Sequence, residues 1–233
     1  MFYHRLVLPK TKILIFSIVT LILLSAALYH FWPSTDPNAT KDSNKNQQLA
    51  YLSIQEDDHV YGDMQAPITL VEYSSVECIS CKKLHTVFKK IAKSYPTDIA
   101  WVFRHAPQTI YPKSFVEAEA LECASEQGGS HAFFNYLDSL FEATNSDNSL
   151  ELSVLPEIAN TVGLDVSRFD TCLKERRFTK RVNRDLYMSS KLDVTTRPHI
   201  FIITPDKNII SLVGYQSYTS METLITHMLS QKR

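Results

Sequence analysis

The apolar residues of this chain predict a fixed order of strands and helices from residue 68 onward. The β-prone run 68–73 predicts a strand, and apolar positions at helical spacing predict a helix over 78–94. The run 99–104 is apolar nearly throughout, as in a buried parallel strand. Five helices are then predicted at 113–127, 131–143, 152–162, 166–174 and 180–191. Two strands follow at 199–203 and 209–213, and a last helix at 220–230.

The order of these elements indicates an α/β fold with a helical insertion. Turn-forming residues at 205–208 predict that the last two strands pair as an antiparallel hairpin. Gly128 and Gly129 predict a break between two of the middle helices. Without the helices between 113 and 191, strand–helix–strand and strand–strand–helix remain, which predicts a mixed sheet covered by helices.

Residues 1–32 have a different pattern, which predicts a transmembrane segment. Basic residues up to Lys12 precede the uncharged run 13–29, which continues through 30–32. At about 1.5 Å per residue, this segment approaches the ~30 Å thickness of a bilayer core. The basic residues predict that the following chain is exported. The alternative is a signal peptide cleaved near the small residues 25–27, after which the remainder is also exported.

Residues 33–58 are predicted to form a polar linker, because they contain too few large apolar side chains to build a core. The whole chain is 44% hydrophobic and 21% charged, which is typical of a globular protein. Its formal net charge of −1 gives no support for a nucleic-acid partner.

The motif Cys78-Ile79-Ser80-Cys81 is the main candidate for chemistry. It joins a predicted strand to a predicted helix, where helix N–H groups and the helix dipole stabilise a thiolate on the first sulfur. Cys81 lies about one turn further on, within reach of a mixed disulfide on Cys78. The alternatives are a structural disulfide and a zinc site completed by His85. The zinc site lacks a fourth ligand, so no metal is predicted, and His85 is expected on the helix surface.

The chain has four cysteines, an even number that fits disulfide chemistry in an exported protein. Proximity favours pairing Cys78 with Cys81, which leaves Cys123 with Cys172. The second pair is then a structural disulfide between two helices, and the alternative is two buried thiols.

From about residue 59 to its C-terminus, the chain resembles the DsbA-type thiol–disulfide oxidoreductases. Six segments in order carry the resemblance: 60–74, 78–81, 103–107, 121–124, 169–173 and 196–201. The resemblance implies a thioredoxin-like fold. It implies that residues 59–108 and 192–233 form the thioredoxin-like domain and that 109–191 form an inserted helical domain.

The resemblance also implies roles for single residues. Cys78 is expected to be the nucleophile, Cys81 to resolve the mixed disulfide, and Pro198 to be a cis-proline facing Cys78. Glu72 is expected to be buried behind the cysteines and to relay a proton to and from Cys81. Glu77, which departs from the family pattern, is expected to oppose a thiolate on Cys78. Substrate contacts are expected at Ile79, Ser80, Thr196 and Arg197.

The function implied is that of an enzyme without a cofactor that introduces disulfides into reduced, unfolded secreted proteins. Its implied redox partner is a quinone-linked membrane protein of the DsbB type. We expect a monomer with a single span in the bacterial inner membrane and a periplasmic catalytic domain, or a soluble periplasmic protein after signal cleavage. The alternatives are a reductase or isomerase kept reduced by a membrane electron donor, and a chaperone-like module that binds clients.

Overall fold

The computed structural model describes residues 21, 24–25 and 37–231, and it divides the chain into two compact units, Met1–Asn46 and Gln47–Arg233. Among the described residues, no helix combines the length and the apolar character that crossing a membrane requires. The transmembrane segment predicted within 1–32 lies almost wholly outside the described part and stays a prediction.

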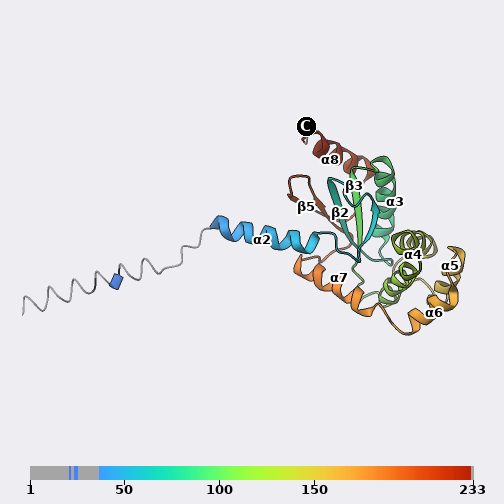
Figure 1. The fold of residues 1–233 in the computed structure, drawn as a ribbon. Helices are drawn as coiled ribbons and strands as arrows, with labels where there is room; N and C mark the ends of the chain where they lie inside the picture. Colours follow the sequence, from blue (N-terminus) through green and yellow to red (C-terminus); the bar gives the residue numbers. More distant parts are fainter. Residues whose placement is uncertain (1–20, 22–23, 26–36, 232–233) are drawn as a thin grey trace, which may run out of the picture. The chain divides into compact units, whose positions relative to one another are not determined.

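The second unit contains a five-stranded mixed sheet in the order β1-β3-β2-β4-β5 (Figure 1). Its strands are β1 (His59–Gly62), β2 (Ile68–Ser74), β3 (Ile99–His105), β4 (His199–Ile203) and β5 (Ile209–Val213). The central pair, β2 and β3, is parallel, and the other three pairs are antiparallel. The predicted β4–β5 hairpin is therefore confirmed, as is the α/β class.

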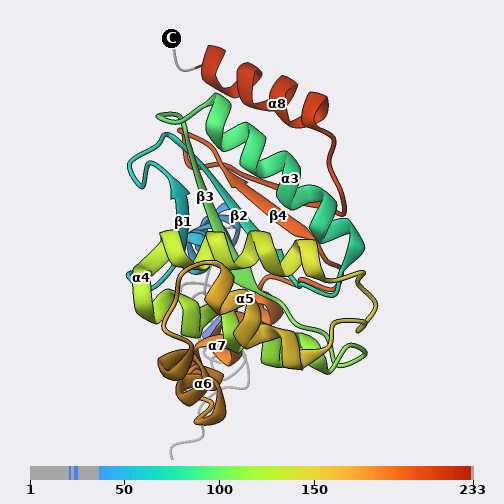
Figure 2. The same ribbon diagram turned by 90° about the vertical axis from the view of Figure 1, so that its right-hand side faces the viewer.

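Helices cover this sheet and form an insertion between β3 and β4. The α-helices are α2 (Pro37–Leu52), α3 (Ile79–Ser94), α4 (Lys113–Ala143), α5 (Leu155–Thr161), α6 (Val166–Lys174), α7 (Thr179–Lys191) and α8 (Tyr218–Ser230), with a short 3-10 helix at Leu152–Val154. In Figure 2, α3 and α8 lie side by side over the sheet, and α4, α5 and α6 gather below them. The predicted break in α4 is present, because Gly128 and Gly129 leave helical geometry.

Alternate side chains of the strands enter two hydrophobic cores, one on each face of the sheet. Leu70 and Trp101 belong to the core that contains residues of α3, α4 and α8. Val71 and Val102 belong to the other core, with residues of α7 and the end of α2. Burial on both faces explains why β3 is apolar nearly throughout.

Two elements differ from the prediction. Residues 37–52, predicted within the polar linker, form α2. This helix has no long apolar face, and near its end Leu49 and Leu52 pack on the core, so hydrophobic periodicity does not reveal it. Strand β1 is only four residues long, too short for an alternating pattern to be recognised.

The fully buried Arg104 on β3 fixes the segment between α2 and β1. Its guanidinium donates to the two carboxylate oxygens of Asp58 at 3.1 and 2.7 Å and to the Ser53 carbonyl at 2.8 Å. A buried charge is stable only when it is paired in this way. Residues 53–58 are therefore part of the folded unit and not a free linker, which corrects the prediction for this stretch.

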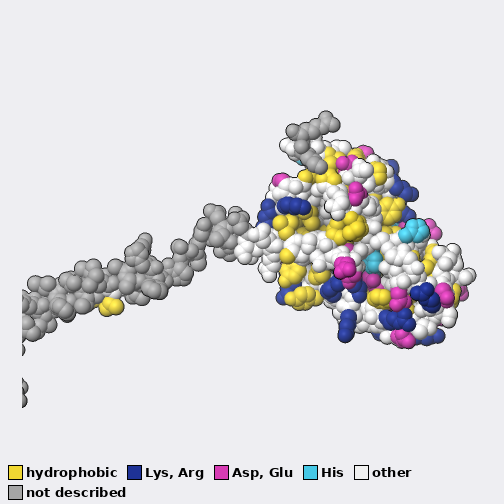
Figure 3. Space-filling view, in the orientation of Figure 1, with side chains coloured by type: hydrophobic (Ala, Val, Ile, Leu, Met, Phe, Trp, Pro, Cys, Tyr) yellow, Lys and Arg dark blue, Asp and Glu magenta, His cyan; other side chains and the backbone are white. Residues whose placement is uncertain are grey.

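The surface drawn in Figure 3 mixes basic, acidic and hydrophobic side chains. On that face of the described part, positive and negative groups are interspersed over the helical insertion. This distribution agrees with the formal net charge of −1.

Candidate active site

Cys78 lies where the chain leaves β2 and enters α3. It is the N-cap residue of α3, with the extended backbone angles φ −106° and ψ 111°, and its Sγ accepts the Cys81 N–H at 3.2 Å. In the structure, Cys78 and Cys81 form a disulfide with a Cα–Cα distance of 5.1 Å. The same N–H is available to a thiolate on Cys78 after reduction, which stabilises the charged form.

The two sulfurs of this pair differ in burial. Cys78 is half-buried, whereas Cys81 is fully buried in the core beneath α3. Ile79, between them, is 48% exposed. An incoming thiolate can therefore reach Cys78 and not Cys81, which divides the roles of nucleophile and resolving cysteine.

The loop before β4 faces the first cysteine. Its Arg197–Pro198 peptide bond is cis, and the Arg197 carbonyl oxygen lies 3.6 Å from Cys78 Sγ. The Arg197 side chain turns toward the loop after β3, where its Nε donates to the Ala106 carbonyl at 2.9 Å. Thr196 remains exposed. The structure thus brings together Cys78, Arg197 and Pro198, which are far apart in the sequence.

Glu72 is a buried carboxyl group on β2. It lies on the same face of its strand as Leu70, in whose core Cys81 also lies, so its side chain is beneath α3. Trp101 Nε1 donates to Glu72 at 3.0 Å. Burial raises the pKa of Glu72 to about 7, and the hydrogen bond from Trp101 only partly opposes this shift. Glu72 can therefore both accept and release a proton near neutral pH.

Glu77, next to Cys78, is also fully buried, and its carboxylate is bound to the helical insertion. It accepts hydrogen bonds from the Thr144 hydroxyl at 3.1 Å and from the backbone N–H groups of Ser149 and Leu150 at 3.2 and 3.1 Å. Its own carbonyl accepts the Asp147 N–H at 3.0 Å. These bonds join the start of α3 to residues 144–150.

Glu117 on α4 adds a second carboxyl group beside Glu77. Burial, followed by the hydrogen bond and negative charge of Glu77, raises the pKa of Glu117 to about 9. Glu117 is therefore protonated at neutral pH and provides a hydrogen-bond donor for the Glu77 carboxylate. The sequence gives one signal for it, since Glu117 lies four residues before Leu121 on the apolar face of a helix.

His85 was expected on the helix surface, and this expectation is wrong. Its side chain is buried, and its Nε2 lies 2.6 Å from Asp138 Oδ1 on α4. Burial lowers the pKa of His85, against the opposing effect of Asp138. Lys89 binds the same carboxylate. The side chain of His85 thus connects α3 to the insertion and does not point toward the cysteines as a zinc ligand would.

Cys123 and Cys172 lie in the helical insertion, away from the redox pair. They form a disulfide between α4 and α6 with a Cα–Cα distance of 5.8 Å, and both residues are buried. This is the pairing that the sequence favours.

The chain is similar to a described protein family and to solved structures of DsbA proteins. Residues 54–223 match the model of a family described as thioredoxin. Wolbachia pipientis alpha-DsbA1 is 25% identical with a TM-score of 0.69, covering 79% of this chain and 96% of that one. Pseudomonas aeruginosa DsbA2 is 25% identical with a TM-score of 0.65, covering 75% of this chain and 96% of that one.

A curated relative shares sequence with part of the chain. The Na(+)/H(+) antiporter NhaA 3 of Salinispora tropica is 33% identical over 146 residues, which are 62% of this chain and 21% of that protein. The chain therefore spans about a fifth of the length of that relative.

Proposed function

Because this chain belongs to the thioredoxin family and is a DsbA-like thiol–disulfide oxidoreductase with Cys78 and Cys81 as its redox pair, we propose that it introduces disulfide bonds into reduced, unfolded proteins outside the cytoplasm. The asymmetry of the pair carries this proposal. Cys78 is reachable and caps a helix, whereas Cys81 is buried. Disulfide exchange with a substrate uses one open sulfur, because the attacking thiolate must reach it, and in the oxidising direction the buried sulfur leaves.

The reaction transfers one disulfide by two thiolate attacks. A substrate thiolate attacks Cys78 Sγ, the Cys78–Cys81 bond breaks, and Cys81 leaves as a thiolate. A second substrate thiolate then attacks the substrate sulfur of this mixed disulfide and releases Cys78 as a thiolate. The substrate loses two electrons and gains a disulfide, and the cysteine pair receives the two electrons.

Glu72 acts as the general acid and base for the buried sulfur of Cys81. The Cys81 thiolate leaves into an apolar core, where an uncompensated charge is unfavourable. Glu72, on the same side of the sheet and with a pKa of about 7, supplies the proton that neutralises Cys81 and recovers it on reoxidation.

Substrate binds around the exposed sulfur. Ile79 offers an exposed apolar side chain, the Arg197 carbonyl lies 3.6 Å from Cys78 Sγ, and Ser80 and Thr196 are their neighbours in the sequence. An extended, unfolded chain pairs with the backbone at Thr196 and Arg197, because such pairing needs no defined substrate sequence.

The remaining assignments concern the setting of the enzyme. A quinone-linked membrane protein of the DsbB type reoxidises the cysteine pair, and the enzyme acts as a monomer. The uncharged run 13–29 with its basic flank supports a single span in the bacterial inner membrane, with the catalytic domain in the periplasm. Cleavage near 25–27 is the alternative and leaves a soluble periplasmic protein.

A reductase is the second candidate, and Glu77 is the observation that favours it. A carboxylate adjacent to Cys78 destabilises a thiolate there, which makes the disulfide less oxidising. The N-cap hydrogen bond from Cys81 acts in the opposite direction.

Single-turnover disulfide transfer tests the proposal. The oxidised full-length protein in detergent micelles is mixed with reduced, unfolded ribonuclease, and free thiols on both proteins are counted over time. We expect each enzyme molecule to remove one pair of substrate thiols and to gain one pair. The protein reduced beforehand at Cys78–Cys81 is the control and should transfer nothing. The proposal is wrong if the oxidised protein transfers no disulfide while the reduced protein opens the disulfides of insulin.

A further inference from the structure

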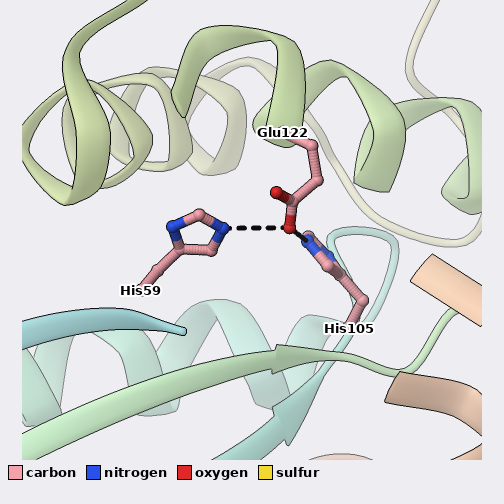
Figure 4. Close-up of side chains that lie close together, drawn as sticks. All are labelled: His59, His105 and Glu122. Atoms are coloured by element: carbon pink, nitrogen blue, oxygen red, sulfur yellow. Dashed lines mark hydrogen bonds and ion pairs between the residues drawn. The ribbon is translucent and has the colours of Figure 1, made fainter. Parts of the chain in front are cut away.

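Two histidines and a glutamate meet in the interior, outside the active site. His59 lies on β1, His105 at the end of β3 and Glu122 on α4, and Figure 4 shows both imidazole rings directed at the same carboxylate. Glu122 Oε1 lies 2.9 Å from His59 Nε2 and 2.7 Å from His105 Nε2. The three residues are 5%, 2% and 3% exposed, respectively.

We propose that His59, His105 and Glu122 form a binding site for a zinc ion. One nitrogen from each histidine and one oxygen from Glu122 lie within 4.8 Å of one another. Two imidazoles and a carboxylate form a donor set that binds zinc, with the fourth position left to water. Cys78 and Cys81 contribute no ligand, so the site is independent of the redox pair.

The two His–Glu distances are close to those between neighbouring ligands of a bound ion. In a tetrahedral site with metal–ligand distances of about 2.0–2.1 Å, neighbouring ligand atoms lie about 3.3 Å apart. The two His–Glu distances of 2.9 and 2.7 Å need to grow by only a few tenths of an ångström. Each histidine uses the Nε2 lone pair after that nitrogen loses its proton.

The surroundings hold His59 in an orientation suited to a ligand. Its ring stacks on Phe133 with centroids 3.8 Å apart and an interplanar angle of 14°. Its other nitrogen, Nδ1, lies 3.4 Å from Ser125 Oγ. When Nε2 binds the ion, Nδ1 carries the proton and donates to Ser125, as metal-bound histidines do to a neighbouring acceptor.

A cavity gives the cluster a route to solvent. It has a volume of about 330 Å³ and is bordered by His59 and Glu122. Its lining contains five carboxylates and one guanidinium, that of Arg181. Arg181 Nε lies 3.8 Å from Glu122 Oε1 and opposes a cation. Three of the carboxylates already pair with arginines outside the lining, Asp57 with Arg184, Asp58 with Arg104 and Glu126 with Arg177. The residues that supply the five carboxylates of the lining are Glu56, Asp57, Asp58, Glu122 and Glu126.

The position of the site indicates what the ion does. The ligands come from two neighbouring strands and from the helix that begins the insertion, so a bound ion ties α4 to the edge of the sheet. Such an ion stabilises the folded state without changing the thiol chemistry.

Zinc titration of the metal-free protein tests the proposal. The full-length protein is kept oxidised, so that both disulfides are closed and no thiol competes for the metal. Zinc is added in competition with a chromophoric chelator, and the melting temperature is followed in parallel. We expect one bound equivalent, a higher melting temperature, and at least tenfold weaker binding in His59→Gln and in His105→Gln. His227→Gln, which makes the same change at an exposed position, should bind like the wild type.

A measurement without substitutions covers the case in which the variants do not fold. In ¹⁵N NMR spectra of the wild-type protein, zinc should shift the imidazole nitrogen signals of His59 and His105. The signals of His227 should stay in place. The proposal is overturned if zinc does not bind saturably, if both histidine variants fold and retain wild-type affinity, or if only other histidines respond.

Discussion

The two disulfides of this protein are the same bond in opposite surroundings. Cys78–Cys81 lies at a helix N-terminus with one half-exposed sulfur, beside Glu77 and on the side of the sheet that holds Glu72. Cys123–Cys172 lies between two helices of the insertion with both residues buried.

The difference shows that access and charge decide which pair reacts. A reachable sulfur permits thiolate attack, and a helix N-cap stabilises the thiolate that leaves. Neither condition is met by two buried sulfurs packed among apolar side chains. The first pair is therefore suited to exchange, and the second to holding α4 and α6 together.

Removing the reachable sulfur should produce the largest effect. Cys78→Ser should lower the rate of disulfide transfer to reduced ribonuclease by about a thousandfold or more, because no other sulfur can take its place. The double variant Cys123→Ser/Cys172→Ser should transfer at nearly the wild-type rate. Equal losses in both proteins would contradict the division of roles.

Removing the second disulfide should instead lower stability. The cysteines are 49 residues apart, and closing a loop of this size contributes about 4 kcal/mol in the chain-entropy model. Guanidinium unfolding of Cys123→Ser/Cys172→Ser at pH 7 should show a loss of this order, with an unchanged Cys78–Cys81 reduction potential. A shifted potential would show that the two disulfides are coupled.

Glu72→Gln removes the proton donor proposed to lie beneath the redox pair. We expect disulfide transfer to slow by about a hundredfold, a typical contribution of general acid–base catalysis. The wild-type pH–rate profile should have an inflection near the Glu72 pKa of about 7, and this inflection should disappear in the variant. A slower variant with the wild-type pH profile would indicate a purely structural role.

Glu117→Gln should change the pH dependence of stability. The pKa of Glu117 is raised from 4.5 to about 9 on folding, so the folded state holds a proton that the unfolded state releases. Wild-type stability should therefore fall as the pH rises from about 5 to 9, by about 1.4 kcal/mol per pH unit from this group.

In Glu117→Gln this contribution should vanish, while the amide still donates to Glu77. Glu142→Gln, at an exposed position of the same helix, is the matched control and should keep the wild-type slope. If the free energy of unfolding changes with pH in the same way in the wild type and in Glu117→Gln, Glu117 is ionised in the folded protein and the prediction is wrong.

Much of the fold could be predicted, because its central strands and helices leave a periodic record in the sequence. Strands buried on both faces, such as β3, are apolar without interruption, and Gly128 and Gly129 mark the break in α4. The helix α2 and the strand β1 could not be predicted, since the first lacks an apolar face and the second is too short.

The cysteines of the site could be predicted for a similar reason, whereas their electrostatic environment could not. Cys78 and Cys81 are three residues apart, so local sequence places them together. Glu117 acts on Glu77 across 40 positions of sequence, and no local motif links the two residues. His59 and Glu122 are 63 residues apart, and no local motif links them.

The reduction potential of Cys78–Cys81 distinguishes a disulfide donor from a reductase. The full-length protein is equilibrated in glutathione buffers of known ratio, and the oxidised fraction is measured after acid quenching and alkylation. We expect a potential of about −150 mV or higher, well above the glutathione pool, as a disulfide donor requires. A value near about −270 mV, that of a reducing thioredoxin, would contradict this expectation and identify the protein as a reductase.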